Sequence, residues 1–139
     1  MALLTPTSTK EEVYSDFLND LTLHPIRKDV SRNLNEESIK RAIKNILLTN
    51  YYERPFRPKF GANITKYLFE PLTPITLTLI RSDIINAITN YEPRANIIDV
   101  TVSADNTDDN SISVTVVFSV INNSNPVTLI TTLALDRVR

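Results

Sequence analysis

The sequence has no cysteine, one glycine and one histidine among its 139 residues, and each shortage excludes a class of site. Without cysteine there is no disulfide and no thiolate metal site. The single glycine, Gly61, excludes the glycine-rich loops that bring backbone close to phosphate groups. His24 alone cannot build a multi-histidine metal centre, and nothing near it marks a catalytic nucleophile. We therefore expect no cofactor, no metal ion and no catalytic residue.

The chain also lacks an excess of either charge and lacks a long apolar run. Its 15 Lys and Arg residues are balanced by 16 Asp and Glu residues, so no bulk field attracts nucleic acid. No apolar run approaches the roughly 20 residues that span a bilayer, and the first residues show no secretory signal. The length suits one domain with its own core. We expect a single domain over residues 1–139 that binds neither nucleic acid nor membrane.

Acidic residues suggest two kinds of chemistry, and neither signal is specific. Asp105, Asp108 and Asp109 might indicate calcium, but an EF-hand loop needs a central glycine and a Glu at its last position, and both are missing. A solvated hairpin turn is the better interpretation. Glycoside hydrolases need two carboxylates at a fixed separation, and any chain with 16 acidic residues supplies such pairs by chance.

Residues 1–33 allow two interpretations. The segment Thr9–Glu12 fits a capping box, and apolar residues follow it at helical spacing: Val13, Phe17, Leu18 and Leu21. The same residues could equally lie as an extended arm, and Pro25 interrupts any longer helix. We predict an irregular N-terminal arm or a short helix here.

Residues 34–95 are predicted to form a helical half with two main helices. Asn35 suits an N-cap, and an apolar stripe follows it to a helix end near Asn50: Ile39, Ala42, Ile43, Ile46 and Leu47. Thr73 and Pro74 fit an N-cap followed by proline in the first turn. A second stripe comprises Leu77, Ile80, Ile84, Ile88 and Tyr91. Ile75–Leu79 also alternates as a strand would, but the longer register favours a helix.

Residues 96–139 are predicted to form an antiparallel meander of three strands, 97–103, 111–120 and 127–135, joined by turns at 104–110 and 122–126. Alternating positions share one face: Ile112, Val114, Val116, Phe118 and Val120, then Val127, Leu129, Thr131, Leu133 and Leu135. The two helices should cover this apolar face, which gives an α+β fold. If the last strand lies at the sheet edge, its unpaired backbone can accept a strand from another chain.

The loop over residues 51–61 is the first candidate binding surface. Two prolines in four positions favour an extended, ordered loop, after which Asn63 could cap a short helical turn through Phe69. The loop holds three cations and two phenylalanines: Arg54, Arg57, Lys59, Phe56 and Phe60. It could cap the core with both rings inward and the cations solvated. Alternatively it is an interface anchor, since aromatic and Arg residues are enriched at binding hot spots.

The second candidate surface is Glu92-Pro93-Arg94, where the helical pattern stops and the strands begin. Proline forbids the helix from continuing, and two opposite charges flank this rigid residue. The unit could present a fixed charged tip to a partner. It could also tie the junction together locally, which would contribute little if the pair were exposed.

In their order along the chain, several segments resemble the baseplate wedge and sheath-initiator proteins of contractile phage tails, a family with relatives in type VI secretion. These segments are Lys28–Arg32, Arg54–Gly61, Leu68–Glu70, Asn90–Arg94 and Phe118–Val120. The resemblance runs from about Val13 to the C-terminus, and residues 1–10 have no clear counterpart. Some members of the family carry a lysozyme label, so a peptidoglycan hydrolase is the alternative function.

The resemblance implies a non-enzymatic subunit of the virion tail baseplate, made in the host cytoplasm and placed around the tail tube in a six-fold symmetric assembly. Glu92, Pro93 and Arg94 would contact the core bundle of the wedge proteins. The strands 111–120 and 127–135 would act as the template for the first ring of sheath protein, through Val114, Val116, Phe118, Val127, Leu129, Thr131 and Leu133. The Arg54–Gly61 loop, with Arg54, Phe56, Arg57 and Phe60, is the further candidate interface.

Overall fold

The computed structural model describes residues 14–18, 20–71, 73–104, 111–121 and 123–134, which fall into two compact units. The first unit covers residues 1–38 and the second residues 39–139. Each is described by itself.

The first unit contains an antiparallel pair of short strands, β1 (Ser15–Phe17) and β2 (Arg32–Leu34). The backbone N–H of Tyr14 donates to Oδ1 of Asn35, and the backbone N–H of Asn35 donates back to the carbonyl of Tyr14. These long-range partners satisfy the backbone of the segment in an extended form. The extended alternative is therefore confirmed for β1, the helical alternative is wrong there, and Thr9–Val13 lie outside the described residues.

His24, in the turn between these strands, has a local structural role. Its Nδ1 accepts hydrogen bonds from the backbone N–H groups of Ile26 and Arg27, both at 3.3 Å. Such side-chain caps stabilise turns in the way that Asx turns do. His24 is half-buried, and its imidazole stabilises the local turn.

Helix α1 (Asn35–Leu48) crosses from the first unit into the second, and its predicted stripe forms much of the core. Ile39, Ile43, Ile46 and Leu47 are buried, and Ala42 is half-buried. The end of α1 is closed by hydrogen bonds to its last carbonyls: the backbone N–H of Thr49 donates to Asn45, and that of Ala62 donates to Ile46. These bonds satisfy groups that a helix end otherwise leaves free.

Helix α2 (Pro74–Tyr91) begins as predicted, with the Thr73 hydroxyl accepting a hydrogen bond from the backbone N–H of Thr76. Its buried face comprises Thr76, Ile80, Ile84, Ala87 and Ile88. The strand alternative for Ile75–Leu79 is wrong, because the cap and the helical spacing beyond Leu79 act together. In the described part of the chain no helix has the length and apolar character needed to cross a membrane.

Between the two helices lies a short 3₁₀ helix, η1 (Ile64–Phe69), at the predicted position. Asn63 occupies its N-cap position with a left-handed backbone (φ 49°) but makes no side-chain capping bond. Asparagine tolerates this backbone region better than most residues. The expectation of a capping side chain was therefore wrong, and the backbone conformation explains the residue.

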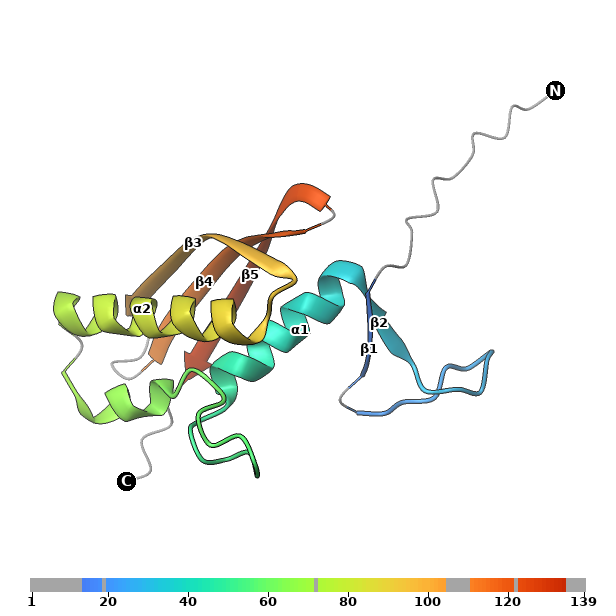
Figure 1. The fold of residues 1–139 in the computed structure, drawn as a ribbon, viewed down its shortest axis with the longest axis horizontal. Helices are drawn as coiled ribbons and strands as arrows, with labels where there is room; N and C mark the ends of the chain where they lie inside the picture. Colours follow the sequence, from blue (N-terminus) through green and yellow to red (C-terminus); the bar gives the residue numbers. More distant parts are fainter. Residues whose placement is uncertain (1–13, 19, 72, 105–110, 122, 135–139) are drawn as a thin grey trace. The chain divides into compact units, whose positions relative to one another are not determined.

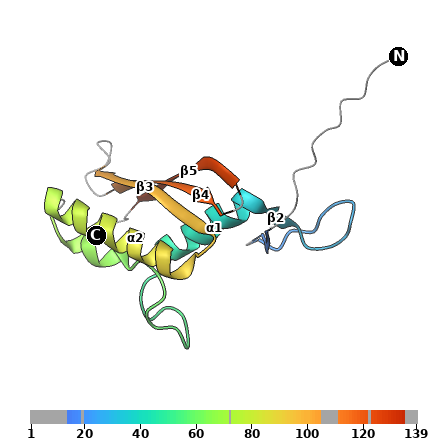
Figure 2. The ribbon, with the colours of Figure 1, turned by 45° about the horizontal axis from the view of Figure 1, so that its top comes forward.

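The C-terminal sheet has the order β3 (Ala95–Ala104), β4 (Ser111–Val120) and β5 (Asn123–Ala134), antiparallel throughout. Its helix-facing positions are buried as the alternation predicts: Val100, Ile112, Val114, Val116, Phe118, Val120 and Val127. Figures 1 and 2 show α1 and α2 on one face of this sheet. The α+β fold and the meander are thus confirmed.

The predicted turn at 122–126 is wrong in part, because Asn123–Pro126 already belong to β5. Pro126 is opposite Ser119 in the register, and a register shift follows between Ser119 and Val120. Proline is tolerated in an edge strand when its missing N–H would point away from the neighbouring strand. The acidic turn residues 105–110, Asn122 and Leu135 lie outside the described residues.

Candidate assembly surfaces

Glu92, Pro93 and Arg94 form the corner between α2 and β3. The Arg94 guanidinium forms a bidentate ion pair with the Glu92 carboxylate, donating from Nε to Oε1 and from Nη2 to Oε2, each at 2.6 Å. The backbone N–H of Glu92 donates to Ile88 at the end of α2, and the carbonyl of Glu92 accepts from Ala95 at the start of β3. The backbone of Arg94 also accepts from Ile121, just after β4. The corner therefore joins three elements.

The burial of the pair separates the roles of its two partners. Glu92 is only 3% exposed, whereas the Arg94 side chain is 30% exposed and Pro93 is exposed. A buried carboxylate requires a paired cation, and the fork geometry of arginine supplies two hydrogen bonds at once. The local tie is thus present in the structure. A partner would meet Pro93 and Arg94, with Glu92 holding Arg94 in place from below.

The loop that follows α1 divides its two phenylalanines. Phe60 is buried and packs on Tyr91 of α2, with ring centroids 4.7 Å apart. The Arg54 guanidinium lies 4.1 Å above the Phe60 ring, and the Tyr91 hydroxyl donates to the carbonyl of Lys59 at 2.6 Å. Phe56, in contrast, is fully exposed at 101%. The interpretation with both rings turned inward is therefore correct for Phe60 and wrong for Phe56.

The base of this loop is closed by backbone and side-chain bonds. Both carboxylate oxygens of Glu53 accept hydrogen bonds from Asn50, and these bonds lower the pKa of Glu53. The Asn50 side chain also accepts from Thr65. Gly61 ends the loop at φ 110°, and a Cβ there would come within 2.1 Å of the Thr49 carbonyl oxygen. Only glycine fits this close approach, which explains the single glycine of the chain.

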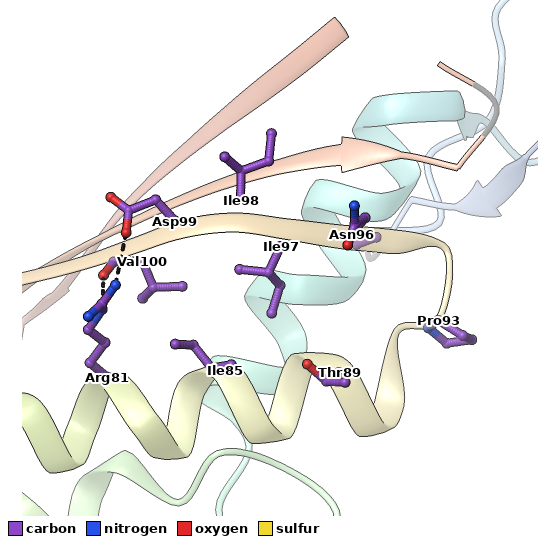
Figure 3. Close-up of a pocket in the computed structure, with 10 residues that line it drawn as sticks. Arg81, Ile85, Thr89, Pro93, Asn96, Ile97, Ile98, Asp99 and Val100 are labelled. Atoms are coloured by element: carbon purple, nitrogen blue, oxygen red, sulfur yellow. Dashed lines mark hydrogen bonds and ion pairs between the residues drawn. The ribbon is translucent and has the colours of Figure 1, made fainter. Parts of the chain in front are cut away.

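The outer edge of β3 is blocked. The Arg81 side chain reaches from α2 and donates from Nε to the backbone carbonyl of Val100 at 2.6 Å and from Nη2 to Asp99 at 3.0 Å (Figure 3). A register shift between Ile97 and Asp99 leaves Ile98 as an extra residue, which is a β-bulge. Side-chain capping and bulges are devices that stop an edge from pairing.

A groove of about 510 Å³ lies between α2 and this blocked edge. Ile85 and Thr89 line its helix side, and Ile97 points into it from β3 while Ile98 points away (Figure 3). Pro93 of the corner closes one end, and Arg81 fills the other (Figure 3). The groove is thus bounded by the corner and by the edge block.

The outer edge of β5 has the opposite character. Val100 turns its carbonyl away from β4, so Val100 and Val116 form a non-hydrogen-bonded pair and Val116 must bond to Leu129 of β5. Alternation then directs the N–H and C=O groups of Thr128 and Ile130 outward, together with the position of Pro126. Both Thr128 and Ile130 have exposed side chains, and Ile130 is 69% exposed. No described strand pairs with this edge.

The residues that the sequence groups as a sheath template lie on two different strands. Val114, Val116 and Phe118 are core residues on the central strand, which is paired on both sides. Val127 is buried and Leu129 half-buried on β5, while Thr131 and Leu133 continue the same strand. Sequence reasoning missed Arg81, Thr128 and Ile130, because only the pairing of distant strands reveals which backbone edge is free.

Several of the described carboxylates make structural contacts. Asp83 of α2 pairs with Lys66 of η1 at 2.6 Å and accepts from the Tyr67 hydroxyl at 2.8 Å. The hydrogen bond to Asp83 raises the pKa of Lys66, and burial together with Asp83 raises the pKa of Tyr67. Asp99 pairs with Arg81, and Glu92 with Arg94. Among the described residues no group of three or more metal-ligating side chains comes together.

Comparison with known sequences points to one family. The sequence profile described as baseplate wedge protein gp25 matches residues 33–125. The chain is 38% identical over 112 residues to the baseplate wedge protein gp25 of Enterobacteria phage T4, a match that covers 81% of this chain and 83% of that protein.

Comparison with solved structures gives the same fold. A tail-lysozyme candidate from Geobacter sulfurreducens is 28% identical with a TM-score of 0.68, covering 75% of this chain and 94% of that one. A chain of the anti-feeding prophage baseplate is 21% identical with a TM-score of 0.61, covering 87% and 85%. A chain of the postcontracted pyocin R2 baseplate is 16% identical with a TM-score of 0.50, covering 78% and 94%. The last two likenesses concern the fold alone.

Proposed function

Because the chain belongs to the family of baseplate wedge protein gp25, a contractile-tail component, we propose that it starts the sheath by accepting a sheath strand along β5. In this role it is a structural subunit that lies around the tail tube in a six-fold assembly. Two further surfaces, the Glu92-Pro93-Arg94 corner and the Arg54–Gly61 loop, hold it against neighbouring wedge proteins.

The single observation that carries the sheath role is the difference between the two sheet edges. On β3, Arg81 occupies the Val100 carbonyl and a bulge interrupts the register. On β5, Thr128 and Ile130 direct their backbone groups outward from exposed positions. An added strand gains main-chain hydrogen bonds only where such groups are free. The proposed template is therefore β5, and the buried residues of β4 support it from within the sheet.

The wedge contact is assigned to the exposed part of the corner. Pro93 and the outer face of Arg94 can meet a partner, while Glu92 fixes the orientation of the guanidinium. A preorganised arginine is a favourable anchor because little side-chain freedom is lost on binding.

Among the described residues, the carboxylates that form ion pairs or hydrogen bonds give the peptidoglycan hydrolase alternative no support. Glu53, Asp83, Glu92 and Asp99 each hold an amide, a hydroxyl or a cation of the chain itself. A structural subunit is the function that these contacts favour.

Replacement of Ile130 by proline tests the sheath role. Ile130→Pro removes an outward N–H from the free edge without taking a hydrogen bond from the β4–β5 ladder. We expect baseplates that contain the variant but carry sheath on fewer than about one tenth of particles, because strand addition loses its central backbone bond. Electron microscopy of tails from cells that lack the native gene measures this fraction.

Ile130→Thr is the matched control, because it changes the side chain and keeps the N–H. We expect it to support sheath assembly at close to the native level. Circular dichroism and thermal melting of both purified variants establish that they fold. Normal sheaths on baseplates carrying folded Ile130→Pro would refute the proposed template.

The wedge contact is tested by Arg94→Lys, which keeps the charge beside Glu92 but loses the fork. We expect the variant to fold and to enter baseplates at least about tenfold less well than the native chain when the two compete in one cell. Arg41→Lys, the same change on α1, serves as the control. Equal incorporation of Arg94→Lys and the native chain would show that the corner is not part of the interface.

A further inference from the structure

Phe56 is exposed to solvent on a loop whose backbone is fixed by hydrogen bonds and ring packing. Its side chain is fully exposed, and the neighbouring aromatic Tyr52 is 83% exposed. Both residues have left-handed backbones, with φ 67° at Phe56 and φ 70° at Tyr52. This conformation is unfavourable for a bulky side chain. Two such residues in one loop call for a compensating function.

The remainder of the loop acts as a support. The backbone N–H of Tyr52 donates to Pro58 at 2.8 Å, which closes the two sides of the loop on each other. Phe60 packs on Tyr91 beneath Arg54, and the Tyr91 hydroxyl holds Lys59. Figures 1 and 2 show the loop after α1 projecting away from the sheet. Phe56 is thus presented on a preorganised projection, which lowers the entropy lost on binding.

The charges around Phe56 indicate the character of its partner. Arg54, Arg57 and Lys59 against Glu53 give the loop a net charge of three minus one, or +2, in a chain whose net charge is −1. Glu53 lies at the base of the loop, where it is bonded to Asn50, and the three cations outnumber it on the exposed surface of the loop. An exposed aromatic ring within a cationic rim is complementary to an apolar pocket bordered by carboxylates.

We propose that Phe56 inserts into an apolar pocket with an acidic rim on a neighbouring baseplate protein, with Tyr52 and Arg57 at the margin. This rests on the proposed function, since it specifies the partner chemistry of the loop contact. It also separates roles within the loop: Phe56 is the anchor, whereas Phe60 and Arg54 position it from inside.

A competition experiment tests the anchor in the assembled baseplate. Native chain and Phe56→Ala are produced together with different tags, and their ratio in purified baseplates is measured by mass spectrometry. We expect the variant to be depleted about 30-fold or more, as for a hot-spot aromatic residue. Phe56→Leu, which keeps an apolar side chain, should be depleted much less. Melting temperatures should be unchanged, because the exposed ring has no packing to lose against the described residues.

A photocrosslinking phenylalanine analogue at position 56 identifies the partner. We expect a crosslink to a different baseplate protein, in a segment containing Asp or Glu, and none from the same analogue at the exposed Lys44 of α1. Equal incorporation of Phe56→Ala, or a crosslink only to another copy of this chain, would overturn the proposal. So would binding of the purified chain to phosphatidylglycerol vesicles that Phe56→Ala abolishes, which would assign the loop to a membrane.

The outcomes separate this inference from the sheath role. If Phe56→Ala enters baseplates normally while Ile130→Pro baseplates lack sheath, the Phe56 proposal is refuted and the proposed sheath role stands. If Phe56→Ala is depleted from baseplates while Ile130→Pro baseplates carry normal sheath, the proposed sheath role is refuted and the Phe56 proposal stands.

Discussion

At the scale of single residues, the corner shows how one pair can serve both of the functions that its sequence suggests. Glu92 is buried and Arg94 is partly exposed, so the pair stabilises the junction on its inner side and displays a fixed guanidinium on its outer side. The same side-chain conformations of Glu92 and Arg94 are compatible with both functions. The proposed partner contact would therefore rest on a structural tie.

Removal of the cation should destabilise the fold. Arg94→Met leaves the Glu92 carboxylate buried without its partner, and we expect a loss of about 3 kcal/mol, the lower end for a buried pair because Arg94 is partly exposed. Urea unfolding measures the change. Asp99→Asn breaks the Arg81–Asp99 pair, whose side chains are 50% and 52% exposed, and should cost less than about 1 kcal/mol. Similar losses in both variants would contradict the assigned burial effect.

At the scale of elements, η1 and α2 are joined by one ionisable cluster. Lys66 and Tyr67 of η1 both bind Asp83 of α2, and Lys66 also lies 4.6 Å above the Tyr67 ring. Both pKa values are raised, so the folded state holds these protons more tightly than the unfolded chain does. The junction should therefore depend on pH at the alkaline end.

The sign of this dependence gives a prediction. Raised pKa values contribute stability that is fully present below the unfolded values, about 10 for both groups, and that is lost as the pH rises through the folded values. We expect a melting temperature that is steady from about pH 7 to 9 and that falls above about pH 10. Asp83→Asn should show a smaller alkaline fall, since burial alone still raises the pKa of Tyr67. An identical alkaline fall in the variant would exclude Asp83 as a cause.

Among the elements, periodicity in the sequence predicts some secondary structure correctly and leaves other segments undecided or wrong. Helix α2 and strand β4 follow their 3.6- and 2-residue patterns over long stretches, and both were predicted correctly. Segment 14–18 was left open between a helix and an extended arm, and segment 123–126 was wrongly predicted as a turn, because both depend on partners elsewhere: Asn35 for the first, and an edge position beside β4 for the second. Local spacing carries no information about those partners.

At the scale of the whole molecule, one blocked and one open edge make strand addition directional. A sheet with two open edges would allow copies of the chain to add head to tail into open filaments. Arg81 and the β3 bulge prevent this on one side while β5 stays available on the other. The arrangement suits a template that must receive a different protein.

Removal of the Arg81 block should therefore promote self-association. We expect Arg81→Ala to elute earlier from a sizing column as its concentration rises, since the β3 edge becomes available to β5 of another copy. Arg41→Ala is the control on α1. Addition of Ile130→Pro to Arg81→Ala should restore the monomer, because the second edge is then lost. Association that survives in the double variant would show that the β5 edge is not involved.

The sequence by itself determined the kinds of elements and the classes of chemistry that are excluded. Alternation and helical stripes specify which side chains face the core, and the absence of cysteine and the presence of only one glycine exclude whole types of site. Only the tertiary structure decided that Glu92 is buried, that Phe60 turns inward while Phe56 faces water, and that β5 rather than β4 offers a free edge. Those outcomes depend on contacts such as Tyr91 with Lys59 and Arg81 with Val100, which join residues far apart in the chain. A periodic pattern in the sequence determines which side chains of an element face the core. Which strand edge of the sheet stays unpaired depends instead on how distant segments of the chain pair.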